Sequence, residues 1–215
     1  MNGPIVNGSI QSDWLKFEED ARYSRDNITV KSGSGKLVTG AVLAAIAVGA
    51  AVAAMNAGNT GNATFGAVTV GAGAVEGVYT LVFTAATKFD VEDPAGVYVG
   101  SGATGAAFAA GGLGFTITAG ATPHVAGDSA TITVAPGTGL MVPYDPDGTQ
   151  GEQHAVGILT DAVDATSANV AAAAVVRHAH IAPSGLAWAD GITDNEKAIA
   201  LAALKLRGIL AVREV

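Results

Sequence analysis

Cysteine is absent from this 215-residue sequence, and charged and aromatic residues are scarce at 14% and 6%. Without cysteine the chain has no disulfide framework, no thiolate nucleophile and no cysteine-ligated zinc site. The low charge also argues against a disordered chain, because disorder needs a polar and charged composition. The 29 glycines and the many alanines instead favour β structure that is rich in small residues.

Basic residues are also few, with 11 Lys and Arg against 19 Asp and Glu, which gives a net charge of −8 and a pI near 4.8. Nucleic-acid affinity depends on Lys and Arg that displace counterions from phosphates. We therefore expect no direct contact with DNA or RNA.

A leader-like start and a long apolar run are missing as well. Residues 1–20 contain no apolar run after a basic start, so we expect no secretory signal and a chain that stays in the cytoplasm where it is made. Ala41–Met55 is uncharged but short, and it lacks flanking aromatic anchors. We predict a buried soluble element there and no membrane contact.

The residue composition and pattern change twice along the chain. Residues 1–20 mix Gly, Pro, Asn and Ser, which is typical of an arm, whereas Tyr23–Val30 is β-prone. Residues 58–136 alternate short Val-, Thr- and Phe-rich runs with glycine turns, as in a β-sandwich. We predict an N-terminal arm at residues 1–22, a core at 23–57 and 137–215, and an inserted β-rich domain at 58–136.

Regular elements can be placed from periodicity and capping signals. In the insert we expect strands at Thr64–Val70, Val78–Thr84, Lys88–Glu92, Gly96–Gly100, Gly114–Thr118 and Ser129–Val134. In the last third, strands are expected at Ala155–Thr160, Ala171–Arg177 and Ile209–Arg213. Thr193 and Glu196 form a capping box, so a helix begins at Asp194 and can end at Gly208, with Ile199, Ala202, Ala203 and Leu206 on its apolar face.

Motifs that would carry chemistry are weak. Gly35-Lys36 lacks the upstream glycine and the following Ser or Thr of a phosphate loop. His178 and His180 alternate on an expected strand and would bind a metal only if His154 or His124 came near, so a polar strand face is favoured. The acidic residues Asp145, Asp147, Asp161 and Asp164 all lie where Asp is favoured in turns. We expect no catalytic residue, no metal and no cofactor.

The C-terminal third carries an ordered set of motifs. They are Pro143-Tyr144-Asp145, Ala155-Val156-Gly157-Ile158-Leu159, Val163-Asp164-Ala165-Thr166 and Leu206-Arg207-Gly208-Ile209. With Tyr23-Ser24-Arg25-Asp26 and Leu37-Val38-Thr39-Gly40, this set closely resembles phage head decoration proteins of the lambda type. The resemblance covers roughly residues 12–48 and 139–214, and the β-rich stretch between them is absent from the short members.

The resemblance implies a mainly β (α+β) fold, with a β-clip-like core of bent ribbons, one C-terminal helix and an inserted β-sandwich-like domain. It also implies a non-enzymatic homotrimer that binds the major capsid protein at local three-fold positions on the outer surface of the virion and stabilises the expanded head. In that family an N-terminal arm orders on binding and adds to capsid β structure. We expect the binding residues to be Trp14, Phe17, Arg22, Tyr23, Arg25, Ile28 and Val30.

Two other classes of protein remain as alternatives. One is a phage surface or tail adhesin, in which β-sandwich modules bind host cell-surface glycans and the isolated protein has no capsid affinity. The other is an enzyme of a related bent-ribbon trimer type, resembling a deoxyuridine triphosphatase. The enzyme would need acidic metal-binding and arginine phosphate-binding motifs, and these are not evident.

Overall fold

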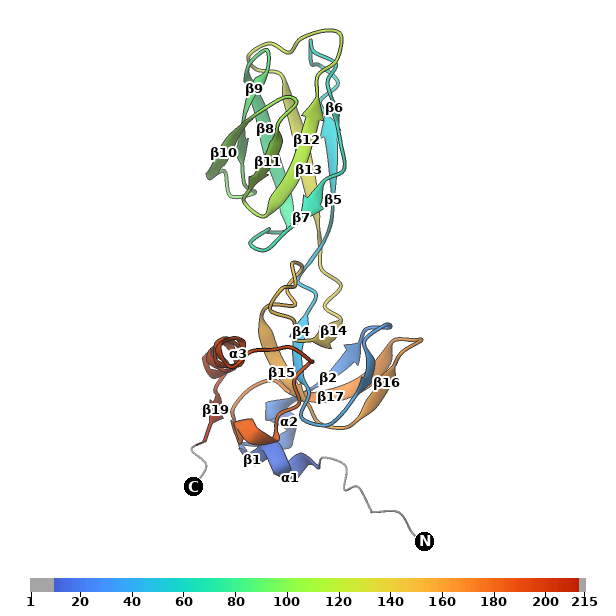
Figure 1. Cartoon of the computed structure of the whole chain (residues 1–215), viewed down its shortest axis with the longest axis vertical. Helices are drawn as coiled ribbons and strands as arrows, with labels where there is room; N and C mark the ends of the chain where they lie inside the picture. Colours follow the sequence, from blue (N-terminus) through green and yellow to red (C-terminus); the bar gives the residue numbers. More distant parts are fainter. Residues whose placement is uncertain (1–9, 213–215) are drawn as a thin grey trace. The chain divides into compact units, whose positions relative to one another are not determined.

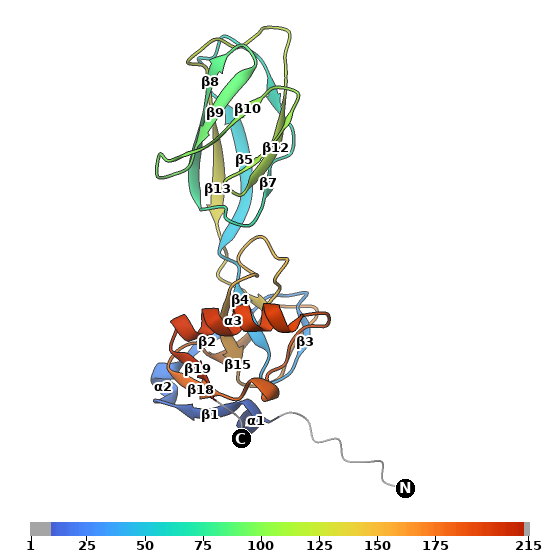
Figure 2. The ribbon, with the colours of Figure 1, turned by 60° about the vertical axis from the view of Figure 1, so that its left-hand side comes forward.

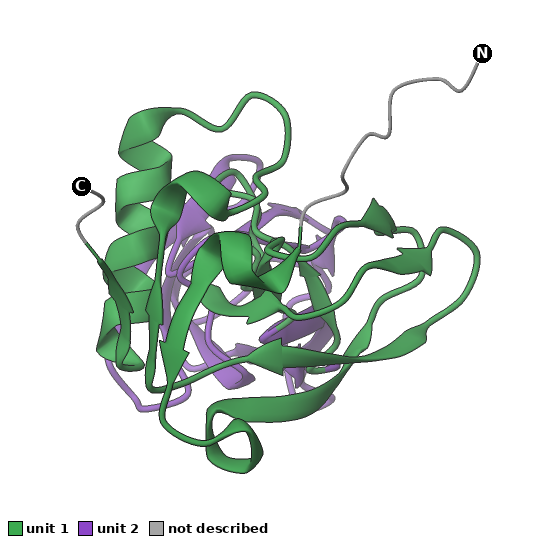
Figure 3. Cartoon of the chain, turned by 90° about the horizontal axis from the view of Figure 1, so that it is seen from below, with its two compact units in different colours: residues 1–46, 139–215 green, residues 47–138 purple. Residues whose placement is uncertain are grey.

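The computed structural model describes residues 10–212 and is mainly β, with 45% strand and 12% helix, so the predicted fold class is confirmed. The chain divides into two compact units (Figure 3). Unit 1 consists of residues 1–46 and 139–215, and unit 2 consists of residues 47–138. Unit 1 is therefore built from two segments that are far apart in the sequence.

Unit 1 contains a closed barrel with the strand order β14-β2-β17-β15-β4. A two-stranded ribbon, β16-β3, and a three-stranded sheet, β1-β18-β19, complete it (Figure 1). The elements are α1 (Gln11–Trp14), β1 (Leu15–Glu18), α2 (Ala21–Ser24), β2 (Arg25–Val30), β3 (Gly35–Leu37), β4 (Val42–Ala45), β14 (Met141–Pro143), β15 (Ala155–Leu159), β16 (Val163–Ala165), β17 (Val170–Val175), β18 (Ala179–Ile181), η1 (Pro183–Gly185), α3 (Asp194–Leu206) and β19 (Ile209–Ala211).

Helix α3 begins at the predicted capping box. Thr193 Oγ1 accepts from the backbone N–H of Glu196, and Glu196 Oε2 accepts from the backbone N–H of Thr193 at 2.7 Å. Gly208 follows the helix with a φ of +75°, a backbone conformation that favours glycine after a helix end. Both ends of the helix are thus determined by residues close to them in sequence.

The apolar face predicted for α3 is wrong for Ile199, Ala202 and Leu206, whereas Ala203 does pack against the core of unit 1. Ala200 and Leu204 are buried against unit 1, whereas Ile199 is 53% exposed and Leu206 is 90% exposed. The helix carries apolar side chains on more than one side, so its period alone does not identify the side that packs. The covering residues come from β15 and β19, and their positions depend on the tertiary fold.

Unit 2 is a sandwich of two sheets. One sheet has the order β10-β9-β8-β13-β5, and the other has the order β11-β12-β6 with β7 paired to β12. Its elements are β5 (Val48–Met55), β6 (Thr64–Phe65), β7 (Thr69–Val70), β8 (Gly77–Ala85), β9 (Lys88–Glu92), β10 (Tyr98–Ala103), β11 (Ala107–Ala110), β12 (Leu113–Thr118) and β13 (Ser129–Pro136). Phe83, Phe89, Phe108 and Phe115 lie in the core between the sheets.

Between residues 58 and 136 the strands of unit 2 follow the expected alternation, with three differences. The strand expected at Gly96–Gly100 begins later, at Tyr98, and β11 was not anticipated. The strand expected over Thr64–Val70 is broken into β6 and β7. Short glycine-rich stretches such as these carry too few large side chains for the period of two to locate a strand.

The boundaries of unit 2 lie at Ala47 and Thr138, whereas the sequence placed the insert at residues 58–136. The cause is β5, which pairs along its length with β13 and therefore belongs to the sandwich. Within unit 1 the two backbone segments that flank the insert are hydrogen-bonded to each other. Ile46 N donates to Leu140 O and Gly139 N donates to Ile46 O, both at 3.0 Å.

Candidate functional site

The seven residues expected to bind a partner lie between α1 and the end of β2, and the structure separates them into buried and exposed groups. Trp14 and Val30 are 0% exposed and Ile28 is 9% exposed. Trp14 also donates from Nε1 to Thr39 Oγ1 at 3.1 Å. These three side chains belong to the core of unit 1 and do not face outward.

The expectation that residues 1–20 form an arm outside the core is therefore wrong for residues 10–20, while residues 1–9 lie outside the described part. Trp14 ends the short helix α1, and Leu15 begins strand β1, which pairs with β18. Burial of the indole ring ties this segment to unit 1, because a large apolar ring gains more from the core than from solvent.

Phe17 and Tyr23 are the exposed aromatic members of the set, at 55% and 48% exposure. Each ring lies beside a histidine that follows much later in the chain. The ring centroids of Phe17 and His180 are 5.4 Å apart, and those of Tyr23 and His178 are 5.3 Å apart. The tertiary fold thus assembles two aromatic–histidine pairs at the surface of unit 1.

Strand register explains why the two pairs lie together. In the antiparallel pairing of β1 with β18, Phe17 lies opposite His180 and Glu18 lies opposite Ala179, and Glu19 N then donates to His178 O. Because side chains alternate along a strand, His180 points outward while Ala179 and Ile181 point into the core, and His178, which directly precedes β18, is exposed as well.

The parallel strand β19 extends this outer face. His180 pairs in register with Leu210, which is 40% exposed, whereas the neighbouring Ile209 is buried. Figure 2 shows β1, β18 and β19 side by side below α3. We call Phe17, Tyr23, His178, His180 and Leu210 the aromatic–histidine patch.

The arginines near the patch differ in their availability. Arg25 forms an ion pair with Glu18, with Nη2 and Oε1 2.6 Å apart, and the hydrogen bonds that Arg25 donates to the Glu18 carboxylate raise the pKa of the guanidinium. Arg22 is exposed and enters none of the ion pairs formed among residues 10–212. Of the two arginines expected to meet acidic groups, Arg22 is the one left for a partner.

Sequence reasoning missed Arg177 and Leu210. Arg177 lies over the Tyr23 ring at 5.6 Å from its centroid, donates to the Tyr23 carbonyl oxygen and forms an ion pair with Asp26. These contacts hold the Tyr23 ring and its exposed backbone in place. No local signal marks Arg177, because its partners lie in α2 and β2, far along the chain.

The metal and acid candidates are not brought together. His124 belongs to unit 2, where its Nδ1 lies 2.7 Å from Asp128 Oδ2, and no group of three or more potential ligands exists among the described residues. Asp145 accepts from the backbone N–H of Asp147, and Asp164 accepts from Thr166. These carboxylates stabilise turns, which is the role predicted for them from the sequence. Within the described part of the chain, no helix is both long and apolar enough to cross a membrane.

Comparison with protein families identifies the chain. The model of Bacteriophage lambda head decoration protein D (HDPD) matches residues 4–209. The chain belongs to this family. A head decoration protein is a structural, non-enzymatic component of the phage capsid, so the chain has a capsid decoration role at the virion surface. The sequence resemblance is thereby confirmed.

Other comparisons add little. No curated protein matches. The flagellar protein FlgL of Xanthomonas campestris is 25% identical over 46% of this chain and 33% of its own, with a TM-score of 0.34. The flagellar hook junction protein FlgK of Burkholderia pseudomallei is 26% identical over 55% of this chain and 21% of its own, with a TM-score of 0.33. This chain thus covers a third or less of those proteins, and scores this low support no inference about the decoration protein.

Proposed function

We propose that this decoration protein binds the major capsid protein as a homotrimer at local three-fold positions and stabilises the expanded head. The observation that supports this best is the aromatic–histidine patch on the β1-β18-β19 sheet. Exposed aromatic side chains that gather at one place are typical of protein interfaces, whereas single exposed apolar residues are normal on any surface.

The proposed contact has a backbone component as well. Strand β1 is at the edge of its sheet and pairs only with β18 among the described strands. An edge strand offers unpaired N–H and C=O groups to an incoming strand of the capsid protein. Backbone pairing at β1 would supply affinity, and the rings of Phe17 and Tyr23 would supply specificity.

Trimerisation strengthens such a contact. Once one subunit is bound, the other two are held near their own sites, so the effective concentration rises without any new contact. A trimer that bridges neighbouring capsomers therefore holds them in the expanded head more strongly than three separate subunits would. This mechanism requires no catalytic group.

The test is sedimentation of the purified chain with expanded, undecorated capsids, together with light scattering for its mass. We expect about three copies to sediment with each local three-fold position. Replacement of Phe17 and Tyr23 by Ala together should weaken binding at least about tenfold, since buried aromatic anchors carry much of an interface's free energy.

The matched control is Tyr98→Ala in unit 2, which removes an equally exposed ring, at 60% exposure, outside the patch. Full binding by the Phe17 and Tyr23 variant would exclude the patch as the contact. Failure of the wild-type chain to sediment with capsids would reject the function itself and would favour the glycan-binding alternative, which a glycan screen then tests.

A further inference from the structure

The last turn of α3 presents an apolar side chain to solvent between two cations. Leu206 is 90% exposed, the highest value among the large exposed apolar residues described. Its neighbours Lys205 and Arg207 are also exposed, and neither takes part in the ion pairs found within residues 10–212. We call Lys205, Leu206 and Arg207 the α3 knob.

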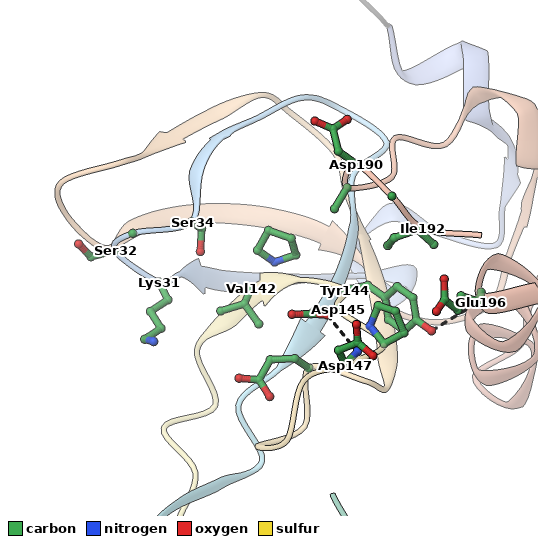
Figure 4. A pocket seen from close by; sticks show the side chains of 16 residues that line it. Lys31, Ser32, Ser34, Val142, Tyr144, Asp145, Asp147, Asp190, Ile192 and Glu196 are labelled. Carbon is green, nitrogen blue, oxygen red and sulfur yellow. Dashed lines mark hydrogen bonds between the residues drawn. The ribbon is translucent and has the colours of Figure 1, made fainter. Parts of the chain in front are cut away.

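A pocket of about 710 Å³ lies in unit 1 near the other end of the same helix (Figure 4). Val142, Tyr144 and Ile192 contribute apolar surface to it. Its charged lining consists of five carboxylates and one ammonium group, namely Asp145, Asp147, Glu152, Asp190, Glu196 and Lys31. The pocket is therefore apolar in part and strongly acidic.

The pKa values of two lining groups agree with this charge. The pKa of Tyr144 is raised, first by burial and then by the nearby carboxylates of Glu196 and Asp145. The pKa of Glu196 is lowered by hydrogen bonds from Thr193, so the carboxylate stays ionised at neutral pH. Figure 4 shows Tyr144, whose hydroxyl donates to the backbone carbonyl oxygen of Glu196, on the side of the pocket next to α3.

The knob of one chain cannot reach the pocket of the same chain. Glu196 lines the pocket and Leu206 follows it ten residues later, so about 15 Å of rigid helix separates them at 1.5 Å per residue. The two surfaces are complementary in charge and in apolar character, but they lie at opposite ends of one element. Only a second molecule can bring them together.

We propose that the α3 knob of one copy inserts into the acidic pocket of a neighbouring copy. The contact joins different surfaces on the two partners, so it is head-to-tail, and such contacts close into a ring when the rotation between copies allows it. In a ring of three, every pocket receives one knob. The inference rests on the proposed trimer and identifies the surfaces that hold it together.

Leu206→Asp tests the apolar part of the contact. A carboxylate in place of Leu206 would meet the acidic pocket, so the protein concentration at which half of the trimer dissociates should rise at least about tenfold. The matched control is Val97→Asp in unit 2, at a residue that is 60% exposed, which should leave the mass unchanged. Sedimentation velocity measures both, and circular dichroism checks that each variant folds.

Charge reversal tests the electrostatic part. Lys205→Glu with Arg207→Glu should dissociate the trimer, and adding Asp147→Lys with Asp190→Lys should restore it, because the pairs are then reversed together. Asp147 and Asp190 are exposed, so their replacement should not disturb folding. Failure of the restoring variants to recover the trimer, while they stay folded, would overturn the proposed pairing.

The absence of native cysteine allows a direct test by cross-linking. With both Leu206→Cys and Asp147→Cys, oxidation should give covalent trimers on a denaturing gel, and each single variant should give monomers. Dimers from a single variant would show a symmetric contact and refute the head-to-tail arrangement. A trimer by mass that yields no cross-link from the double variant would also refute it.

These outcomes separate the inference from the proposed function. A wild-type chain that binds capsids as a trimer, together with a trimeric Leu206→Asp variant, rejects the knob contact and leaves the function standing. A wild-type chain that forms the cross-linked trimer but does not bind capsids rejects the function and leaves the contact standing.

Discussion

The two units build their hydrophobic cores from differently arranged parts of the sequence. Unit 2 is one continuous segment whose sandwich is filled by four phenylalanines contributed by neighbouring strands. Unit 1 joins two distant segments, and its core combines Trp14 of the first segment with Tyr144, Leu204 and Ile209 of the second. A core made from both chain ends depends on long-range contacts, so unit 1 is the more vulnerable to a single lost anchor.

Their surfaces differ as well. Unit 2 exposes mostly valines, including Val52 at 70% and Val97 at 60%, spread over several strands and turns. In unit 1 the exposed rings of Phe17 and Tyr23 gather with His178, His180 and Leu210. Scattered valines need no partner, whereas a gathered aromatic patch predicts one. The comparison places the proposed binding surfaces in unit 1.

The largest expected effect is from Trp14→Ala. Loss of a fully buried indole should lower the free energy of unfolding of unit 1 by about 3–5 kcal/mol and leave unit 2 unchanged. Both tryptophans of the chain, Trp14 and Trp188, lie in unit 1, so the fluorescence of Trp188 reports the unfolding of that unit alone.

Phe83→Ala is the reciprocal variant in unit 2. It should destabilise the sandwich by a similar amount and leave the tryptophan signal in place, since Phe83 is 0% exposed in the unit 2 core. If either variant shifts both transitions equally, the two units unfold as one cooperative structure and the comparison fails.

The next effect depends on pH and concerns Asp128 in unit 2. Hydrogen bonds from the backbone N–H groups of Thr60 and Gly61, and then from His124, hold the pKa of Asp128 far below its usual value, against the opposing effect of burial. A lowered folded-state pKa stabilises the fold above the unfolded-state pKa of about 3.9. This stability is lost as the pH falls from there towards the folded-state pKa.

Asp128→Asn should therefore destabilise unit 2 at pH 7, and the difference from wild type should shrink as the pH drops below about 4. Thermal unfolding of both proteins between pH 3 and pH 7 measures this difference. A constant difference over that range would show that the carboxylate charge is not the cause.

A smaller effect is expected from His178→Gly. His178 has a φ of +45°, a conformation that L residues disfavour, so glycine should raise the stability of unit 1 by about 0.5–1 kcal/mol. Tyr23 would lose its ring partner, so capsid binding should weaken even as the fold is strengthened. Chemical denaturation and capsid sedimentation measure the two quantities, and weaker folding would contradict the predicted strain.

The smallest effect on unit 1 is expected from removing unit 2. Ile46 bonds to both Gly139 and Leu140, so a short Gly-Ser linker in place of residues 47–138 should leave unit 1 folded within about 0.5 kcal/mol. Tryptophan-detected unfolding and capsid sedimentation test this. Loss of the folded signal would show that unit 1 needs the insert.

Prediction from the sequence succeeded where it rested on local capping and periodicity or on motifs shared with a known family. The Thr193–Glu196 capping box, the glycine after α3 and strand β9 at Lys88–Glu92 all match, because capping and alternation involve residues a few positions apart. The ordered motifs of the C-terminal third also identified the family. Prediction failed for residues 10–20 of the expected arm, since the same aromatic signal at Trp14 and Phe17 led to a buried ring and an exposed one.

The sequence by itself determined the mainly β class, the position of the C-terminal helix and the capsid decoration family, because periodicity, caps and ordered motifs are written along the chain. Only the tertiary structure decided that Trp14 is core, that Phe17 meets His180 and that Leu206 faces solvent. Burial and contact are set by residues that are distant in the sequence, from Thr39 beside Trp14 to His180 beside Phe17, and no local pattern records which side of a strand or helix they will cover.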